Sequence, residues 1–192
     1  MAIKTFTTGE VLTAADTNTF LANAGLDYIG AVTLNAVTNN ISNVFSSTYQ
    51  SYRVVISGLN NATTTTRRLN IRFRTGSDDN SANYSGFQTF GYGSPGTTGF
   101  GGETGQAQGL ICSLSNTATA GAGMSFDIWN PNTAAITTWA GTCITYQLDV
   151  VGFVLRTFGG AMNTTTQYTG FSIIGTTDAL SGTVRVYGYR QA

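Results

Sequence analysis

The sequence predicts an all-β fold, specifically an antiparallel β-sandwich of jelly-roll type with a short N-terminal helix. Its 192 residues include 24 Gly, 33 Thr, 15 Asn and 14 Ser, and 11% are aromatic. Thr, Tyr and Phe suit a pleated surface, whereas Gly, Asn and Ser suit turns. Segments of alternating polarity recur about every ten to fifteen residues with turn residues between them, which is typical of sandwiches.

The first 25 residues differ from the rest and predict a helix over 14–24. The Thr13 hydroxyl can cap the amide of Asp16, and the Asp16 carboxylate can reach back in a short form of the capping box. Phe20 and Leu21 then share one side of the helix. A helix of this length is marginal alone in water, so it needs a surface to pack on.

We therefore divide the chain into an attachment and oligomerisation segment, 1–25, and a sandwich domain, 26–192. Within the sandwich we expect nine or ten strands. The stronger candidates are 52–58, 69–74, 124–128, 142–156, 168–174 and 183–189, and the weaker ones are 30–35, 41–46, 85–92 and 107–114.

Two of these segments show their faces plainly. In 69–74, Leu69, Ile71 and Phe73 are expected to point inward, and Arg72 and Arg74 outward into solvent. Residues 142–156 predict one long strand or a bent pair, with Ile144, Tyr146, Leu148 and Val150 on one apolar face.

The stretch from Gly86 to Gly109 holds nine of the 24 glycines. Because glycine at this density disfavours regular structure, we predict a strand start followed by a long surface loop. The loop would present Phe87, Phe90, Tyr92 and Phe100. These rings suit contact with an uncharged sugar or a protein surface, or else pack beneath the loop or against a neighbouring subunit.

Charge excludes several function classes. Nine acidic residues balance nine basic ones, and the sequence contains no histidine. No basic excess exists to bind nucleic acid, and histidine catalysis or ligation is impossible. No apolar run approaches the ~20 residues that span a bilayer, so membrane insertion is not expected. We expect no metal and no cofactor.

The positions of the carboxylates in the sequence do not suggest a catalytic pair, so we do not expect an enzyme. A glycosidase needs two of them flanking the scissile bond. Asp78 and Asp79 instead lie in a turn sequence that favours an Asx turn over a calcium site, and Asp127 and Asp149 are expected to point outward or to pair with Arg72, Arg74 or Arg156.

Cysteine and tryptophan complete the expectations. Cys112 and Cys143 lie in apolar contexts and are expected to be buried free thiols, with a disulfide or a metal as the alternatives. Either Trp129 or Trp139 could be in the core, and Trp139, beside small residues, is the better interface candidate.

Both ends of the chain carry recognisable motifs. The opening Phe6–Asn18, FTTGEVLTAADTN, and the close Ser181–Arg190, SGTVRVYGYR, resemble those of tail-fibre and related structural proteins of tailed bacteriophages. Residues 46–56, SSTYQSYRVVI, resemble the sandwich of the same proteins. The chain has no long shaft, so a short knob, fibre tip or capsid spike fits it better than a long fibre.

This resemblance implies a virion protein, assembled in the host cytoplasm, that forms a homotrimer with an N-terminal attachment segment. We expect a tail-fibre or spike protein that contacts other virion proteins and a host surface glycan or protein. The alternative is a capsid decoration protein or head fibre without receptor binding. Multivalent docking would supply the avidity, and no chemistry is required.

Overall fold

The computed structural model describes residues 7–11, 13, 25–61, 66–92, 98–114, 122–147 and 152–190. The helix predicted over 14–24, with Asp16, Phe20 and Leu21, lies outside these residues. The described part contains no helix, so it also has none that could cross a membrane. Its thirteen strands are β1 (Leu26–Leu34), β2 (Thr38–Ile41), β3 (Ser51–Asn61), β4 (Arg67–Thr75), β5 (Ser77–Asp78), β6 (Tyr84–Tyr92), β7 (Thr98–Gln106), β8 (Gly109–Leu114), β9 (Ala122–Trp129), β10 (Thr137–Gln147), β11 (Gly152–Met162), β12 (Gly170–Gly175) and β13 (Leu180–Tyr189).

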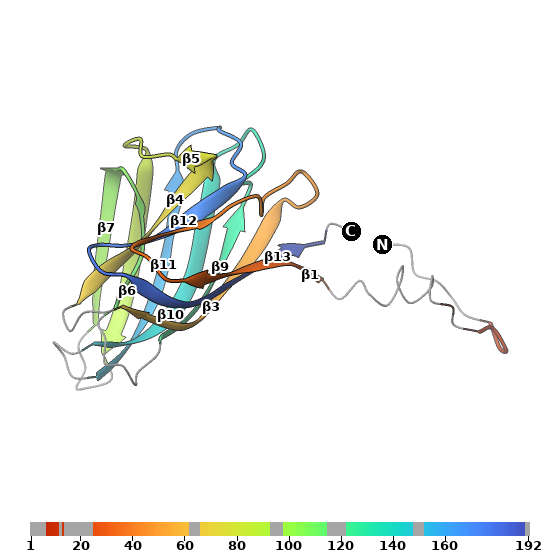
Figure 1. Ribbon diagram of the computed structural model, residues 1–192, viewed down its shortest axis with the longest axis horizontal. Helices are drawn as coiled ribbons and strands as arrows, with labels where there is room; N and C mark the ends of the chain where they lie inside the picture. The colour runs from red at the N-terminus through yellow and green to blue at the C-terminus, as the bar shows by residue number, and fades with distance from the viewer. Residues whose placement is uncertain are drawn as a thin grey trace.

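The strands form two antiparallel sheets that pack face to face (Figure 1). The larger sheet has the order β1-β13-β3-β9-β10-β11-β6-β7, and the smaller one β2-β12-β4, with β5 and β8 both paired to β4. Eight of the strands interleave as β1-β13-β3-β9 against β2-β12-β4-β8. This is the double Greek key of a jelly roll, so the predicted antiparallel sandwich is confirmed.

The larger sheet continues beyond the jelly roll by four strands, which we call the extension: β10, β11, β6 and β7. The β6–β7 hairpin is inserted between β4 and β8, and the β10–β11 hairpin between β9 and β12. The two insertions meet where β11 pairs with β6, from Val154↔Tyr92 to Met162↔Tyr84. The extension therefore depends on segments that are distant in the sequence. We call the other eight paired strands, β1-β13-β3-β9 and β2-β12-β4-β8, the jelly-roll half.

The core lies between the sheets and is rich in aromatic rings. Leu69, Ile71 and Phe73 are fully buried, which confirms the inward face predicted for this strand. The Phe73 ring lies 5.7 Å from that of Trp139 and 5.3 Å from that of Tyr168. Burial of such rings supplies most of the driving force for folding.

The glycine-rich stretch is not a long loop, which corrects the sequence prediction. Most of it forms the paired strands β6 and β7. Phe90 stands opposite Gly99, where an added Cβ would collide with the Phe90 ring. At Gly159 an added Cβ would lie 3.2 Å from the Phe87 ring. Glycine is therefore needed here because aromatic rings from neighbouring strands lie flat over the backbone.

Three further expectations need correction. Trp139 is buried and only 1% exposed, whereas Trp129 is 37% exposed, so the interface candidate of the two is Trp129. Arg74 is buried rather than solvated. Its Nη2 donates a hydrogen bond to the Gly76 carbonyl oxygen at 2.6 Å. Asp127 lies on the outward side of β9, as one of the two predicted alternatives had it, but its partner there is Arg53 rather than Arg72, Arg74 or Arg156.

Candidate functional site

At one end of the extension, the polarity of β10 and β11 is inverted relative to an ordinary sandwich. Alternate positions of a strand face opposite sides of its sheet. In β10 and β11, Thr145, Gln147 and Arg156 face inward and are buried, whereas Ile144 and Leu155 face outward and are 50% and 59% exposed. Of the apolar face predicted for 142–156, Ile144 and Tyr146 thus lie outward and cover no core in the described part of the chain, while Leu148 and Val150 lie outside the described residues.

Specific polar contacts hold the inward side of the extension. Thr145 Oγ1 and Gln147 Nε2 both donate to the Ser113 carbonyl oxygen on β8, at 3.3 and 3.4 Å. The Arg156 guanidinium donates to Gln88 Oε1 at 3.3 Å and lies 4.7 Å from the centroid of the Phe90 ring. Buried polar groups need such partners, so these positions tie the extension to β8.

Four apolar side chains gather at one end of the outward face, and we call them the distal strip: Ile144, Tyr146, Phe153 and Leu155. Ile144 is paired with Leu155, and Tyr146 with Phe153, whose ring centroids are 5.4 Å apart. None of the outward positions of the four extension strands carries a charged residue. A contiguous exposed apolar surface of this kind marks an interaction site.

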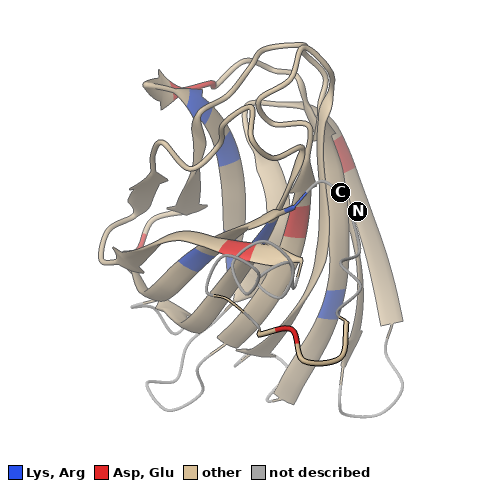
Figure 2. Ribbon diagram, turned by 90° about the vertical axis from the view of Figure 1, so that its right-hand side faces the viewer, with Lys and Arg blue, Asp and Glu red and all other residues tan. Residues whose placement is uncertain are grey.

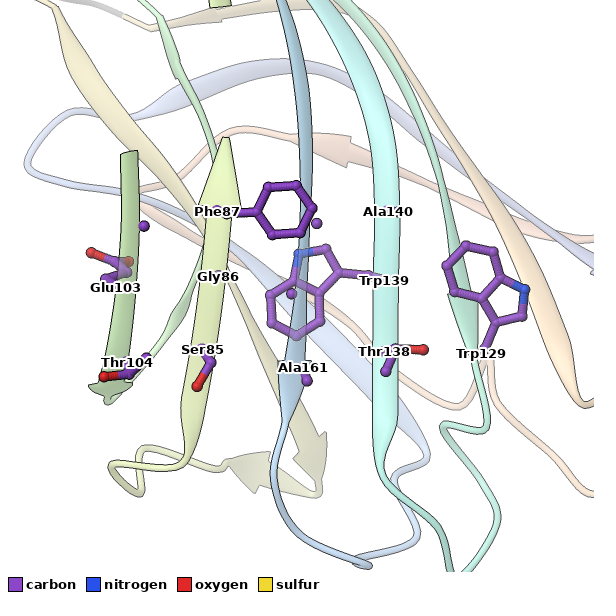
Figure 3. A pocket seen from close by; sticks show the side chains of 13 residues that line it. Ser85, Gly86, Phe87, Glu103, Thr104, Trp129, Thr138, Trp139, Ala140 and Ala161 are labelled. Atoms are coloured by element: carbon purple, nitrogen blue, oxygen red, sulfur yellow. The ribbon is translucent and has the colours of Figure 1, made fainter. Parts of the chain in front are cut away.

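A groove lies on the same face, nearer the other end of the strands. Phe87 on β6 and Trp129 on β9 rise on its two sides, and Thr138, Ala140 and Ala161 lie between them (Figure 3). Gly159 adds to the floor, and the volume of the groove is about 680 Å³. Small residues here leave a gap in the layer of side chains that covers the sheet.

The structure separates the four aromatic residues expected to contact a receptor. Phe87 and Phe100 lie on the outward face, 55% and 88% exposed. Phe90 and Tyr92 face inward, with ring centroids 5.4 Å apart. Trp129, which completes the groove with Phe87, was missed. Its place beside the turn at Asn130 hinted at exposure, but only the pairing of β9 with β10 brings it to this face.

Every carboxylate in the described part of the chain has a donor partner. Figure 2 shows the charged residues as short, separate bands along the strands. Glu103 accepts from Arg68 at 2.8 Å, and Asp127 accepts from Arg53 at 2.6 Å. The remaining acids and their partners are Glu10 with Thr7, Asp27 with Arg190, Asp78 with Ser172, Asp79 with Ser81, and Asp178 with Thr177.

The Asp79 turn is the most strongly organised of these groups. The Asp79 carboxylate accepts from the amide and the hydroxyl of Ser81 at 3.0 and 2.6 Å, which confirms the predicted Asx turn, and from the Tyr168 hydroxyl at 2.8 Å. Burial works to raise the pKa of Asp79, but these hydrogen bonds outweigh it and lower the pKa. This carboxylate is a structural anchor for two loops.

The two cysteines are buried free thiols, as predicted. Cys112 lies on β8 and Cys143 on β10, so they meet between the two sheets. A hydrogen bond to Cys143, together with burial, holds the pKa of the Cys112 thiol well above its ordinary value. Within the described residues, no three His, Cys, Asp or Glu side chains gather as a metal site would require.

Of the residues assigned to attachment, Thr13 is described and lies in no helix or strand, whereas Asp16, Phe20 and Leu21 are outside the described residues. The candidate interaction surfaces among the described residues are thus the distal strip and the groove, both on the outward face of the extension. Neither the scan against protein-family models nor the search of curated proteins finds a match to this chain.

Proposed function

We propose that this chain is a structural protein of a tailed-phage virion, a homotrimeric tail-fibre or spike protein that contacts the host surface without catalysis. The single observation that carries the proposal is the uncharged, apolar outward face of the extension. A sheet face that places Ile144, Phe153 and Leu155 in water while burying Arg156 is built to be covered.

The distal strip is the surface through which copies of the chain contact one another. Its side chains project from two paired strands of a rigid sheet, so they can pack without ordering a loop. Three copies around an axis would each bury the strip against a neighbour and close the ring. The motifs at the two ends of the chain, which resemble those of phage fibre proteins, support the same assembly.

Trimerisation also explains how such a protein would work. Weak contacts repeated on one particle raise the effective concentration for each further contact, and avidity then exceeds single-site affinity by about 10²–10⁴. The carboxylates of the described part are all engaged in hydrogen bonds or ion pairs, which supports a role in docking rather than in bond cleavage.

Two measurements test the proposal. Light scattering of the purified chain should return about three times the 20.2 kDa of one copy, and a mass near 20.2 kDa at every concentration would contradict the trimer. Imaging of particles that carry a label at the C-terminus should place the protein on the tail. Density on the capsid alone would replace the receptor role with that of a decoration protein.

A further inference from the structure

We infer that the groove between Phe87 and Trp129 binds a short, uncharged oligosaccharide. This inference deepens the proposed function, on which it rests for the place where the sugar is met, by naming the class of receptor. Three features of the groove support an uncharged sugar: its shape, its lack of free charge and the chemistry of the side chains that line it.

The shape fits a narrow rod better than a flat surface. Phe87 is 55% exposed and Trp129 is 37% exposed, and both stand above a floor made by Ala140, Gly159 and Ala161 (Figure 3). A second copy of the sheet would rest on the two rings and leave the floor empty. The strands that carry Phe87 and Trp129 are three strand intervals apart, about 14 Å at the usual strand spacing. The Phe87 ring leans over Gly159 on β11, so the space between the two rings is narrower than this and suits a short oligosaccharide.

The floor must remain small for structural reasons as well. A Cβ at Gly159 would lie 3.2 and 3.3 Å from carbons of the Phe87 ring, so that ring rests directly on the glycine backbone. At Gly160 a Cβ would collide with the Trp139 ring beneath. The Phe87 ring therefore covers Gly159 and forms one side of the groove, and the small residues Ala140 and Ala161 leave the space between this ring and Trp129 open.

The charge and chemistry of the lining select the ligand. Glu103 is the one ionisable residue of the lining, and its carboxylate is already held by Arg68 at 2.8 Å. No cation lines the groove to pair with an acidic sugar. Aromatic faces at both sides suit the C–H faces of pyranose rings, and the hydroxyls of Ser85, Thr104 and Thr138 suit sugar hydroxyls.

The test uses the full chain and a panel of neutral trisaccharides built from hexoses, 6-deoxyhexoses or N-acetylhexosamines, beside sialylated and uronic-acid counterparts. Binding is measured by calorimetry and by indole fluorescence. Because Trp139 is buried, a change in emission reports on Trp129. We expect saturable binding of at least one neutral trisaccharide. Binding of acidic sugars alone, or of none, would overturn the inference.

Three variants that each remove one ring, and a fourth that fills the floor, locate the site. Phe87→Ala and Trp129→Ala each remove one ring and should weaken binding at least tenfold, while Phe100→Ala removes an exposed ring outside the groove and should leave it within twofold. Equal losses in all three would show that the groove is not the site. Ala140→Leu keeps both rings but fills the floor, and should abolish binding without unfolding the chain.

The two proposals fail separately. A trimer that is found on the phage tail but binds no neutral trisaccharide overturns only the sugar site. A chain that binds a trisaccharide in the groove but is absent from virions overturns the proposed function and leaves the sugar site standing.

Discussion

The jelly-roll half and the extension share one sheet, yet the end of the extension that carries the distal strip has the opposite polarity. On the jelly-roll half, Val54 and Ile56 face the core, while Arg53 faces outward and donates to Asp127 at 2.6 and 2.7 Å. On the extension, Arg156 is inside and Leu155 outside. The first region buries its aliphatic side chains in the core, whereas the second leaves Ile144, Phe153 and Leu155 about half exposed on the outward face.

We therefore expect the two regions to contribute differently, the jelly-roll half to folding and the outward face of the extension to association. Removing apolar surface from the jelly-roll half should cost folding energy, because those side chains fill the shared core. Removing it from the outward face of the extension should cost association instead. Paired substitutions at buried and exposed positions separate these two contributions.

The largest effect is expected for Phe73→Ala, which empties the centre of the aromatic core. Phe73 is fully buried against Tyr168 and Trp139, and such a truncation costs about 3–5 kcal/mol of the ~5–15 kcal/mol that stabilises a domain. Phe100→Ala on the extension, where the ring is 88% exposed, should change stability by less than about 0.5 kcal/mol. Urea unfolding of both variants measures the contrast, and equal losses would remove it.

A smaller loss is expected for Gly160→Ala on β11. The added methyl group would collide with the Trp139 ring and the Ser85 carbonyl oxygen, and overpacking of this kind costs about 1–3 kcal/mol. Gly101→Ala on β7 is the matched control, because nothing lies within 4 Å of the Cβ that it adds. Thermal unfolding should separate the two variants. A stable Gly160→Ala protein would mean that β11 does not pack on the Trp139 ring of β10 as described.

Alkaline pH should destabilise the jelly-roll half by an amount on the order of 1 kcal/mol. Burial, with a further contribution from the neighbouring Asp79 carboxylate, raises the pKa of Tyr168 to about 12. A raised folded-state pKa means that the stabilising contribution is complete below the unfolded value, near pH 10, and is lost as the pH rises through about 12.

The free energy of unfolding, measured by denaturant between pH 9 and 12, checks this expectation. Tyr168→Phe cannot ionise at this position and should flatten part of the slope, although it also loses the hydrogen bond to Asp79 at 2.8 Å. An unchanged slope in Tyr168→Phe would show that other groups account for the alkaline loss.

The smallest effect on stability is expected for Leu155→Thr on the distal strip. Leu155 is 59% exposed, so the folded chain should lose less than about 0.5 kcal/mol, while the mass measured by light scattering should fall from trimer to monomer. Tyr28→Thr, at an equally exposed ring at the far end of the same sheet, should leave the trimer intact. Loss of the trimer in both variants would contradict the assignment of the trimer contact to the distal strip.

Alternation in the sequence predicted the sandwich, but it could not assign every face. In 69–74 the charged residues at Arg72 and Arg74 mark the outer side, so the inward face was clear. In 142–147 neither side carries a charged residue, and the pattern shows that Ile144 and Tyr146 share a face without showing which way that face points. Only the packing of β8 against the other side decides it.

The candidate site depended still more on pairing between distant segments. Strand β7 was missed because glycine disfavours strands, and the Phe90 ring that justifies Gly99 lies on the partner strand. Phe87 was singled out correctly as an exposed ring. Trp129 was not, since it joins Phe87 only through two further strands that the sequence does not place side by side.

The central claim is that other copies of the chain cover the outward face of the extension, and cysteine labelling tests it most directly. Leu155→Cys places a small apolar thiol on the distal strip, and Ser181→Cys places one at an exposed position of β13. The two native thiols are buried. On dilution from trimer to monomer, we predict that maleimide labelling of Leu155→Cys accelerates at least tenfold while that of Ser181→Cys does not change. Equal labelling rates at every concentration would contradict the claim.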